Sequence, residues 1–304
     1  MMKSKVFKTL AVALLLAVPF TACDEDDDNP VTTDPEVAAP TNLQAASGNN
    51  AVFLSWDASI DEEADNFGSY EITILNRANN ETLAPRTAAK GINDIRIDGL
   101  TNGVRYLFTV RSVTDLGNVS TDFASIEWSP ATRQTTDKDG LPIKVYATTS
   151  SQFNSAVDLY NVDGDAEVIP QAGQEFQDRG DMYLFAETNA APLFITSPAE
   201  ADNQGLITQF SSQSPVATDN LDDQLGLEPP ADDSYTVDEI QIPDGAVESG
   251  RVYWGRLVRG NDHFYFRLLV KKGSNGMLVQ GGGADRFIEM VASFQNAPNN
   301  PFAK

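Results

Sequence analysis

Residues 104–113 read Val-Arg-Tyr-Leu-Phe-Thr-Val-Arg-Ser-Val, and this stretch decides the fold class of the chain. Tyr106, Phe108 and Val110 are spaced two residues apart, so they lie on one face of an extended chain. Arg105 and Arg111 fall in the opposite register. A period of two is typical of a half-buried β-strand, and no helical period competes with it here. The stretch therefore predicts a strand with one apolar face.

Three further runs upstream of this stretch alternate in the same way, with turn residues between them. They are residues 52–56, 69–75 and 94–97. Short alternating strands that follow one another at the spacing of turns are the pattern of a β-sandwich. We therefore expect the first third of the chain to fold as a sandwich of antiparallel strands.

The residues around these runs resemble the fibronectin type III domain over positions 39–135. The matching motifs are Pro-Thr-Asn-Leu (40–43), Leu-Ser-Trp (54–56), Tyr-Glu-Ile (70–72) and Gly-Leu-Thr-Asn-Gly-Val-Arg-Tyr (99–106). The resemblance implies an immunoglobulin-like sandwich of seven strands without a disulfide. It also implies that Trp56 is the core tryptophan of an early strand and that Tyr106 is the residue of a tyrosine corner.

The remainder of the chain, residues 141–304, also has the pattern of strands, and it follows a polar linker at 136–140. We expect a second β-sandwich or jelly-roll-like domain here, so the whole chain is predicted to be all-β. The predicted strands are 144–148, 156–160, 182–186, 192–195, 235–242, 251–258, 263–271 and 287–294, with a long acidic loop around 197–234.

The first 22 residues have the layout of a secretory signal peptide, because three lysines precede a short apolar run at 10–18. The sequence Phe-Thr-Ala-Cys that ends at Cys23 resembles the lipobox of bacterial lipoproteins. This resemblance implies that Cys23 is acylated and anchors the protein to a lipid bilayer. The alternative is an ordinary cleaved signal followed by an incidental cysteine.

Residues 23–38 form an acidic stretch interrupted by prolines, which we expect to be an extended tether. Its first part, Asp-Glu-Asp-Asp-Asp at 24–28, resembles the surface-export signal of Bacteroidetes-type lipoproteins. That resemblance implies an outer-membrane lipoprotein displayed on the cell surface. A solvated spacer on the periplasmic face of the membrane is the alternative.

The composition excludes several classes of function. The chain has 44 acidic and 21 basic residues, which gives a formal net charge of −23. Binding to nucleic acid requires Lys and Arg side chains to neutralise phosphates, so we expect no nucleic-acid partner. Because the chain has a single cysteine, it has no internal disulfide.

The sequence contains no nucleophile paired with a base, and we predict no catalytic residue. His263 is the only histidine, and we expect it to be a half-exposed residue at the start of a strand. Neither a Walker loop nor a nucleophile elbow occurs. The tripeptide Arg-Gly-Asp at 179–181 lies outside the first domain, and we expect it to enter a strand without a function of its own.

One candidate cation site follows from the spacing of oxygen-bearing side chains. Asn161, Asp163, Asp165 and Glu167 occupy every second position, which suits a hard cation such as calcium. An acidic β-turn between two strands is the alternative. Calcium is the one cofactor that the sequence suggests.

One candidate ligand-binding cluster consists of aromatic residues. Tyr253, Trp254 and Tyr265 lie on adjacent predicted strands, and exposed rings of this kind stack against sugar rings. Tyr253 and Trp254 are neighbours in one strand and point to opposite faces, so at least one of them is expected in the core.

From these features we expect a membrane-anchored, cell-surface lipoprotein that is not an enzyme. It would act as a binding, adhesion or display module for an unidentified protein or polysaccharide. One alternative is a carbohydrate-active enzyme, or an accessory subunit of one, with a carboxylate pair that the sequence does not mark out. The other alternative is a structural component of the envelope.

Overall fold

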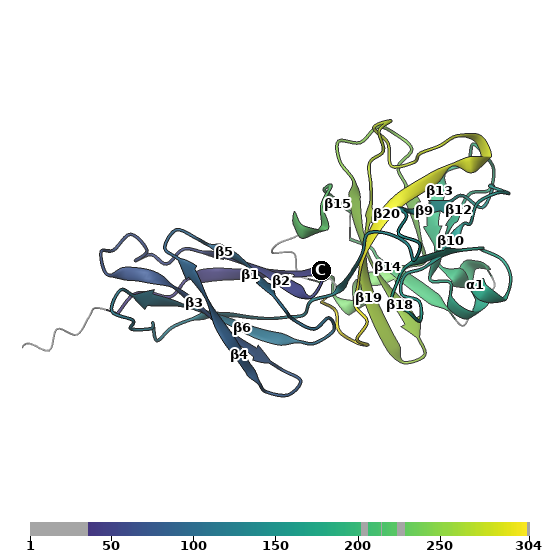
Figure 1. The fold of residues 1–304 in the computed structure, drawn as a ribbon. Coiled ribbons are helices and arrows are strands. Elements are labelled where there is room, and N and C mark those ends of the chain that lie inside the picture. Colours follow the sequence, from purple (N-terminus) through teal and green to yellow (C-terminus); the bar gives the residue numbers. More distant parts are fainter. Residues whose placement is uncertain (1–35, 202–205, 214, 224–228, 303–304) are drawn as a thin grey trace, which may run out of the picture. The chain divides into compact units, whose positions relative to one another are not determined.

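The computed structural model describes residues 36–201, 206–213, 215–223 and 229–302. All of them belong to one compact unit, Asp34–Lys304. The predicted signal peptide, Cys23 and most of the acidic tether lie outside the described residues. No helix in the described part of the chain is both long and apolar enough to cross a membrane. The described chain is almost entirely β-structure, as the sequence predicts (Figure 1).

The N-terminal sandwich consists of two antiparallel sheets. The first has the strand order β1 (Thr41–Gly48), β2 (Ala51–Asp57), β5 (Asp94–Asp98). The second has the order β4 (Thr82–Ala89), β3 (Phe67–Asn76), β6 (Tyr106–Thr114), β7 (Ala124–Trp128). Strand β6 comes from the stretch at 104–113, and its alternate residues Tyr106, Phe108 and Val110 are buried in the core. The period of two therefore predicted the inward face of this strand correctly.

Both residues that the resemblance singled out are in the expected places. Trp56 is buried, and its ring meets that of Tyr70 edge to face with 5.4 Å between centroids. The hydroxyl oxygen of Tyr106 accepts a hydrogen bond from the backbone N–H of Thr101 at 3.1 Å. This bond back to an upstream backbone group is the contact that defines a tyrosine corner.

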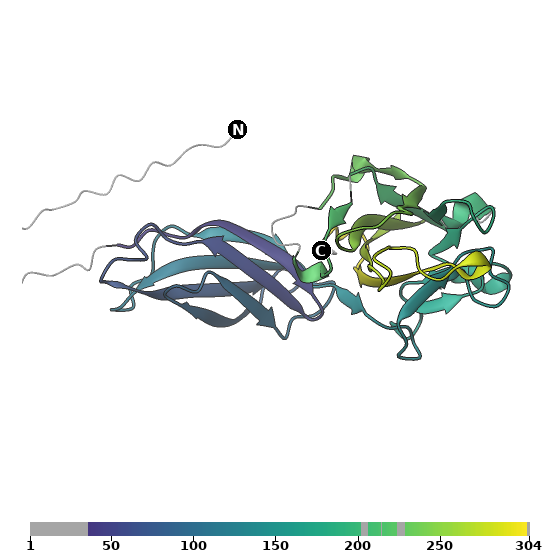
Figure 2. The same ribbon diagram turned by 90° about the horizontal axis from the view of Figure 1, so that it is seen from above.

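The C-terminal domain is a second sandwich with one core between two sheets (Figure 2). The first sheet has the order β11 (Glu167–Ile169), β10 (Ala156–Asp158), β12 (Met182–Phe185), β13 (Leu193–Thr196), β17 (Glu239–Ile242). The second has the order β16 (Tyr235–Val237), β14 (Ile207–Ser211), β18 (Arg251–Arg259), β19 (Asp262–Val270), β20 (Phe287–Phe294), β8 (Thr132–Gln134). In addition, β15 (Val216–Ala217) pairs with β18, and β9 (Ile143–Tyr146) pairs with β20. Five short helices complete the described elements: α1 (Gln174–Arg179), η1 (Pro198–Ala201), η2 (Leu221–Asp223), η3 (Asp232–Ser234) and η4 (Gly283–Asp285).

Strand β19 is buried on both faces, which a simple two-layer sandwich does not require. Phe266, Leu268 and Val270 lie in the core between the sheets, as their alternation predicts. On the other face, Leu269 packs with Leu221. Tyr265 packs with residues of β16 and β18 on that same face. The segment predicted as a long acidic loop around 197–234 thus supplies β14 and β15, which join this sheet, and η2, whose Leu221 packs on its outer face.

The chain enters the second sandwich earlier than the sequence suggests. Strand β8 lies within 39–135, yet it pairs with β20 of the C-terminal domain. The predicted linker at 136–140 is a turn, because the backbone N–H of Asp137 donates to Leu141 O at 2.7 Å and that of Lys138 donates to Ala166 O at 2.8 Å.

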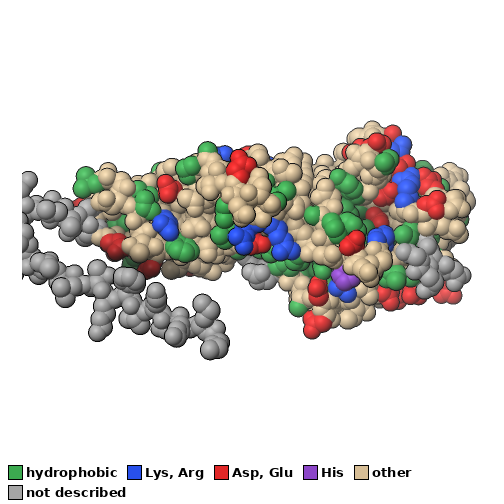
Figure 3. Space-filling model, turned by 90° about the horizontal axis from the view of Figure 1, so that it is seen from below, with side chains coloured by type: hydrophobic (Ala, Val, Ile, Leu, Met, Phe, Trp, Pro, Cys, Tyr) green, Lys and Arg blue, Asp and Glu red, His purple; other side chains and the backbone are tan. Residues whose placement is uncertain are grey.

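Acidic side chains are distributed across the face drawn in Figure 3, among basic and neutral ones. This distribution agrees with the spread of Asp and Glu along the sequence. A negative charge spread over a surface keeps protein molecules apart in solution and does not by itself mark a site.

Candidate functional site

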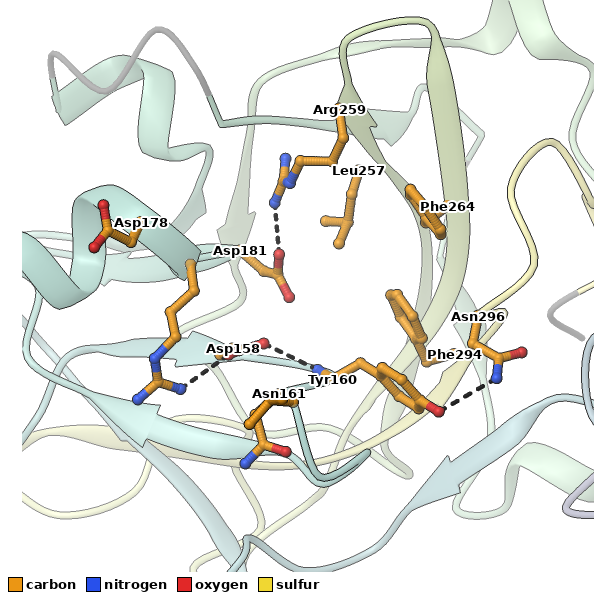
Figure 4. Close-up of a pocket in the computed structure, with 12 residues that line it drawn as sticks. Asp158, Tyr160, Asn161, Asp178, Asp181, Leu257, Arg259, Phe264, Phe294 and Asn296 are labelled. Atoms are coloured by element: carbon orange, nitrogen blue, oxygen red, sulfur yellow. Dashed lines mark hydrogen bonds and ion pairs between the residues drawn. The ribbon is translucent and has the colours of Figure 1, made fainter.

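A cavity lies at the end of the C-terminal sandwich where β10, β18 and β20 end and β19 begins. Its volume is about 530 Å³. It is lined by Asp158, Tyr160, Asn161, Val162, Asp178, Arg179, Asp181, Leu257, Arg259, Phe264, Phe294 and Asn296. Acidic and basic side chains occupy one wall and aromatic rings the other, with Asp181 facing Phe264 and Phe294 across the opening (Figure 4).

The polar wall is built from two ion pairs between buried carboxylates and arginines. Asp181 lies just before β12, and Arg259 Nη2 donates to its Oδ1 at 2.6 Å. Asp158 ends β10, and Arg179 Nη1 donates to its Oδ2 at 2.9 Å. Both carboxylates are nearly inaccessible, with exposed side-chain fractions of 7% for Asp181 and 6% for Asp158. Buried charges are stable only when they are paired, so the two arginines are what allows these carboxylates to be there.

The remaining carboxyl oxygens of the two pairs are held by backbone groups. The N–H of Leu159 donates to Asp181 Oδ2 at 2.7 Å, and the N–H of Tyr160 donates to Asp158 Oδ1 at 3.1 Å. All four oxygens of Asp158 and Asp181 therefore accept a hydrogen bond from within the chain. The wall is fixed in place before any ligand arrives.

Burial sets the protonation behaviour of this wall. It raises the pKa of Asp181 to about 6, although Arg259 favours the charged form. It also raises the pKa of Asp158, against the opposing effect of Arg179. Asp158 and Asp181 repel each other when both are charged, which adds to the raised pKa of Asp181. The two carboxylates are thus close enough to influence one another.

The aromatic wall consists of three rings in nearly parallel planes. The ring of Phe294 is 5.3 Å from that of Tyr160, at an interplanar angle of 16°. It is 6.4 Å from the ring of Phe264, at 8°. Asn296 Nδ2 donates to the hydroxyl oxygen of Tyr160 at 3.3 Å and so fixes the outermost ring. A stack of three aromatic rings therefore faces the charged wall.

Of the predicted calcium ligands, Asn161 alone lines this cavity, and the side chains of Asn161 and Glu167 are engaged with the protein itself. Asn161 Oδ1 accepts hydrogen bonds from the backbone N–H of Asp163 and of Asp165, which makes it the cap of a tight turn. Glu167 Oε2 is 2.7 Å from Arg179 Nη1. No cluster of three or more His, Cys, Asp or Glu side chains suited to a metal occurs among the described residues. The structure therefore does not bring the four side chains together around a common point.

The predicted aromatic cluster is not a surface platform. Tyr253, Trp254 and Tyr265 have exposed fractions of 4%, 5% and 3%. Tyr253 belongs to the core between the sheets, and the other two pack with Tyr235 on the outer face of the second sheet. The opposite orientation of Tyr253 and Trp254 is confirmed, but all three rings are buried and no sugar can stack on them.

Two residues of the cavity, Arg179 and Asp181, come from the Arg-Gly-Asp tripeptide, which was expected to have no function of its own. Arg179 ends α1, and Asp181 precedes β12, so both side chains reach the polar wall. A signal was present in the sequence, because Asp158 follows Ala-Val and Asp181 precedes Met-Tyr-Leu. An acidic residue at the end of a short apolar run belongs to a buried strand end and needs a partner. His263 lies near the start of β19, half-buried, as expected.

Comparison with known proteins identifies the N-terminal sandwich. Residues 38–124 match the family model of the fibronectin type III domain, in agreement with the strand order, the buried Trp56 and the corner at Tyr106. The N-terminal sandwich is therefore a fibronectin type III domain. No curated protein sequence matches the chain.

Several solved structures are similar to about a third of the chain. A myokine matches with 15% identity and a TM-score of 0.26, over 31% of this chain and 99% of that one. The spore cortex lytic enzyme SleM of Clostridium perfringens matches with 20% identity and a TM-score of 0.25, over 31% of this chain and 28% of that one. A fibronectin type III domain of human collagen XX matches with 16% identity and a TM-score of 0.25, over 31% and 96% of the two chains.

Proposed function

We propose that this protein is a lipid-anchored binding protein whose C-terminal domain captures a saccharide unit of a polysaccharide. The observation that carries the proposal is the cavity with an aromatic wall opposite a fixed charged wall. One face of a sugar ring presents C–H bonds, which pack on an aromatic surface, while its hydroxyl groups hydrogen-bond to polar groups at its edges. A fibronectin type III domain suits the role of a spacer or scaffold for such a domain.

The capture is proposed to be non-enzymatic. Hydrolysis of a glycosidic bond requires one carboxyl group to protonate the leaving oxygen and a second to act as base or nucleophile. In this cavity each carboxyl oxygen of Asp158 and Asp181 already accepts a hydrogen bond from an arginine or a backbone N–H. Carboxylates held in this way are suited to orienting the arginines rather than to proton transfer.

A glycoside hydrolase is the second candidate, because burial raises the pKa of both carboxyl groups in the same cavity. One measurement distinguishes a binding protein from a hydrolase. A binding protein releases no reducing ends when it is incubated with soluble polysaccharides, and this is the result we expect. Release of reducing ends that stops in an Asp181→Asn variant would establish the hydrolase instead.

We expect Phe264→Ala to weaken binding of the preferred polysaccharide about tenfold, because the substitution removes one ring of the aromatic wall. The measurement is isothermal titration of the full-length exported protein with polysaccharides that bind it on an array. Phe123→Ala is the matched control, since Phe123 is 53% exposed and lies in the other domain. Equal affinities of wild type and Phe264→Ala, at equal thermal stability, would contradict the role of the cavity.

The proposed anchor and location rest on the sequence around Cys23. We expect protease added to intact cells to degrade the protein, and a Cys23→Ser variant to lose both labelling by a palmitate analogue and sedimentation with membranes. The acyl chains supply the affinity for the membrane. Replacing the sulfur atom of Cys23 by the oxygen of serine removes the group that is acylated, and the affinity for the membrane is lost with it. Degradation only after the outer envelope is opened would place the protein on the periplasmic face. Unchanged labelling of the serine variant would rule out Cys23 as the acylated residue.

A further inference from the structure

The C-terminal sandwich has a second concave surface, of about 370 Å³, which we call the edge groove. It lies between β9 and β11. Strand β11 is the last strand of its sheet, and β9 pairs with β20 alone among the described strands. The groove therefore follows the open edge of the sandwich, where neither sheet continues.

Two aromatic side chains that line this groove, Tyr146 and Phe153, form a row with the neighbouring ring of Phe287. On β9, Ile143 and Val145 point into the core, so Lys144 and Tyr146 point outward. The ring of Tyr146 stacks on that of Phe153 with 4.2 Å between centroids and an interplanar angle of 18°. The ring of Phe287 from β20 is 5.0 Å from that of Tyr146. Phe153 is 47% exposed, so the end of the row is open to solvent.

Polar groups surround this row on the same surface. Lys144 Nζ lies over the ring of Phe287 at 5.3 Å. Asn154 uses its amide N–H to bind Val168 O at 3.1 Å, which leaves its side-chain oxygen for other partners. Asp137 lines the groove as well and caps the turn before β9. The lining thus combines flat apolar faces with a cation, an amide and a carboxylate.

We infer that the edge groove is a second saccharide-binding site, in which a sugar ring of a polysaccharide chain lies on Phe153, whose ring is backed by that of Tyr146. A purely apolar partner would leave the ammonium group of Lys144 and the side-chain oxygen of Asn154 without hydrogen-bond partners in the interface, which costs free energy. A sugar ring satisfies both parts of the lining, since its hydroxyl groups reach the polar groups while its C–H face covers the rings. This inference extends the proposed function to another surface and does not depend on the cavity.

The groove and the cavity lie on opposite sides of β11. Glu167 faces the arginine of the cavity wall, whereas the next residue, Val168, lines the groove. Neighbouring residues of a strand point to opposite faces, so β11 separates the two sites. Each site can therefore be altered without a change in the other.

The experiment is affinity gel electrophoresis of the full-length exported protein through gels that contain xylan, mannan, dextran, pectin or chondroitin sulfate. We expect Phe153→Ala to raise the dissociation constant for a retarding polysaccharide at least tenfold. Phe185→Ala is the matched control, because Phe185 is 38% exposed in the same domain but outside the groove. Since Phe153 is exposed, its replacement should leave the thermal stability unchanged.

Including the Phe264→Ala variant in the same experiment distinguishes binding at the edge groove from binding at the cavity. Weaker retardation of Phe153→Ala supports the groove, whatever the behaviour of Phe264→Ala. Unchanged retardation of Phe153→Ala overturns the groove, and the cavity then stands if Phe264→Ala alone is weakened. No retardation of the wild type in any gel overturns both sites. A change from dimer to monomer in Phe153→Ala would show that the groove binds a second copy of the chain, and it would also overturn the inference.

Discussion

Replacement of Asp181 by alanine is expected to lower the free energy of unfolding of the C-terminal domain by about 3 kcal/mol. The substitution leaves the guanidinium group of Arg259, which is only 23% exposed, without its carboxylate. It also leaves the backbone N–H of Leu159 without its acceptor. Removing one partner of a buried ion pair costs about 3–5 kcal/mol because the remaining charge is uncompensated. Because Arg259 is partly exposed to water, we expect a loss at the lower end of this range.

The variant Asp181→Asn should lose less, and its comparison with the wild type gives a pH signature. Burial raises the pKa of Asp181 from its ordinary value of 3.8 to about 6. Between these values the folded state holds a proton that the unfolded state releases, so this group favours folding at low pH and loses that contribution as pH rises through about 6. The stability advantage of the wild type over Asp181→Asn should therefore be larger at pH 5 than at pH 7, by about 1 kcal/mol.

Urea denaturation followed by circular dichroism at the two pH values measures these differences. The asparagine variant is the matched control, since its amide oxygen can still accept from Leu159 while its charge is gone. An advantage of the wild type that grows from pH 5 to pH 7 would show that the ion pair with Arg259 outweighs burial. An alanine variant as stable as the wild type would show that Arg259 is hydrated and does not need Asp181.

The alternation of side chains predicted most of the fold, and the failures have physical causes. Strand β6 and the strands of the second sandwich from β18 to β20 have one or two apolar faces, so their patterns are strong. Strand β14 was missed because Ile207–Ser211 is short and lies in an acidic region that reads as a loop. Its burial comes from its neighbours β16 and β18, which sequence alone does not bring together.

The sites were harder to predict than the fold, because they depend on exposure and on distant pairing. At least one of the rings at 253 and 254 was expected in the core and the rest of the cluster at the surface, but all three rings at 253, 254 and 265 are buried. Tyr146 and Phe153 were overlooked, since nothing in sequence shows that Phe153 stacks on β9. Asp181 and Arg259 are far apart along the chain and meet only through the sheet arrangement. A site formed by two segments that are distant in the sequence can be recognised only once the fold has brought them together.

Gly255→Ala is expected to lower the free energy of unfolding of the C-terminal domain by about 3 kcal/mol. Gly255 lies in the middle of β18, directly opposite Phe266 of β19. A Cβ atom at Gly255 would come within 2.7 Å of the ring atoms Cε1 and Cε2 of Phe266. That ring is 1% exposed and packs edge to face on Phe210, so it has no free space to move into. Overpacking of a dense core costs about 1–3 kcal/mol, and this contact is far inside van der Waals distance.

The matched control is Gly245→Ala, because a Cβ at that position meets nothing within 4 Å and its backbone does not need the conformations reserved for glycine. We expect this control to have the stability of the wild type in urea denaturation. The double variant Gly255→Ala, Phe266→Leu should be more stable than the sum of the two single changes predicts, since the smaller side chain removes the clash. Additive losses in this cycle would mean that Gly255 is required for a reason other than the ring of Phe266. A glycine in the middle of a strand normally weakens a sheet, and here the aromatic ring across the strand pair covers the backbone that the glycine exposes.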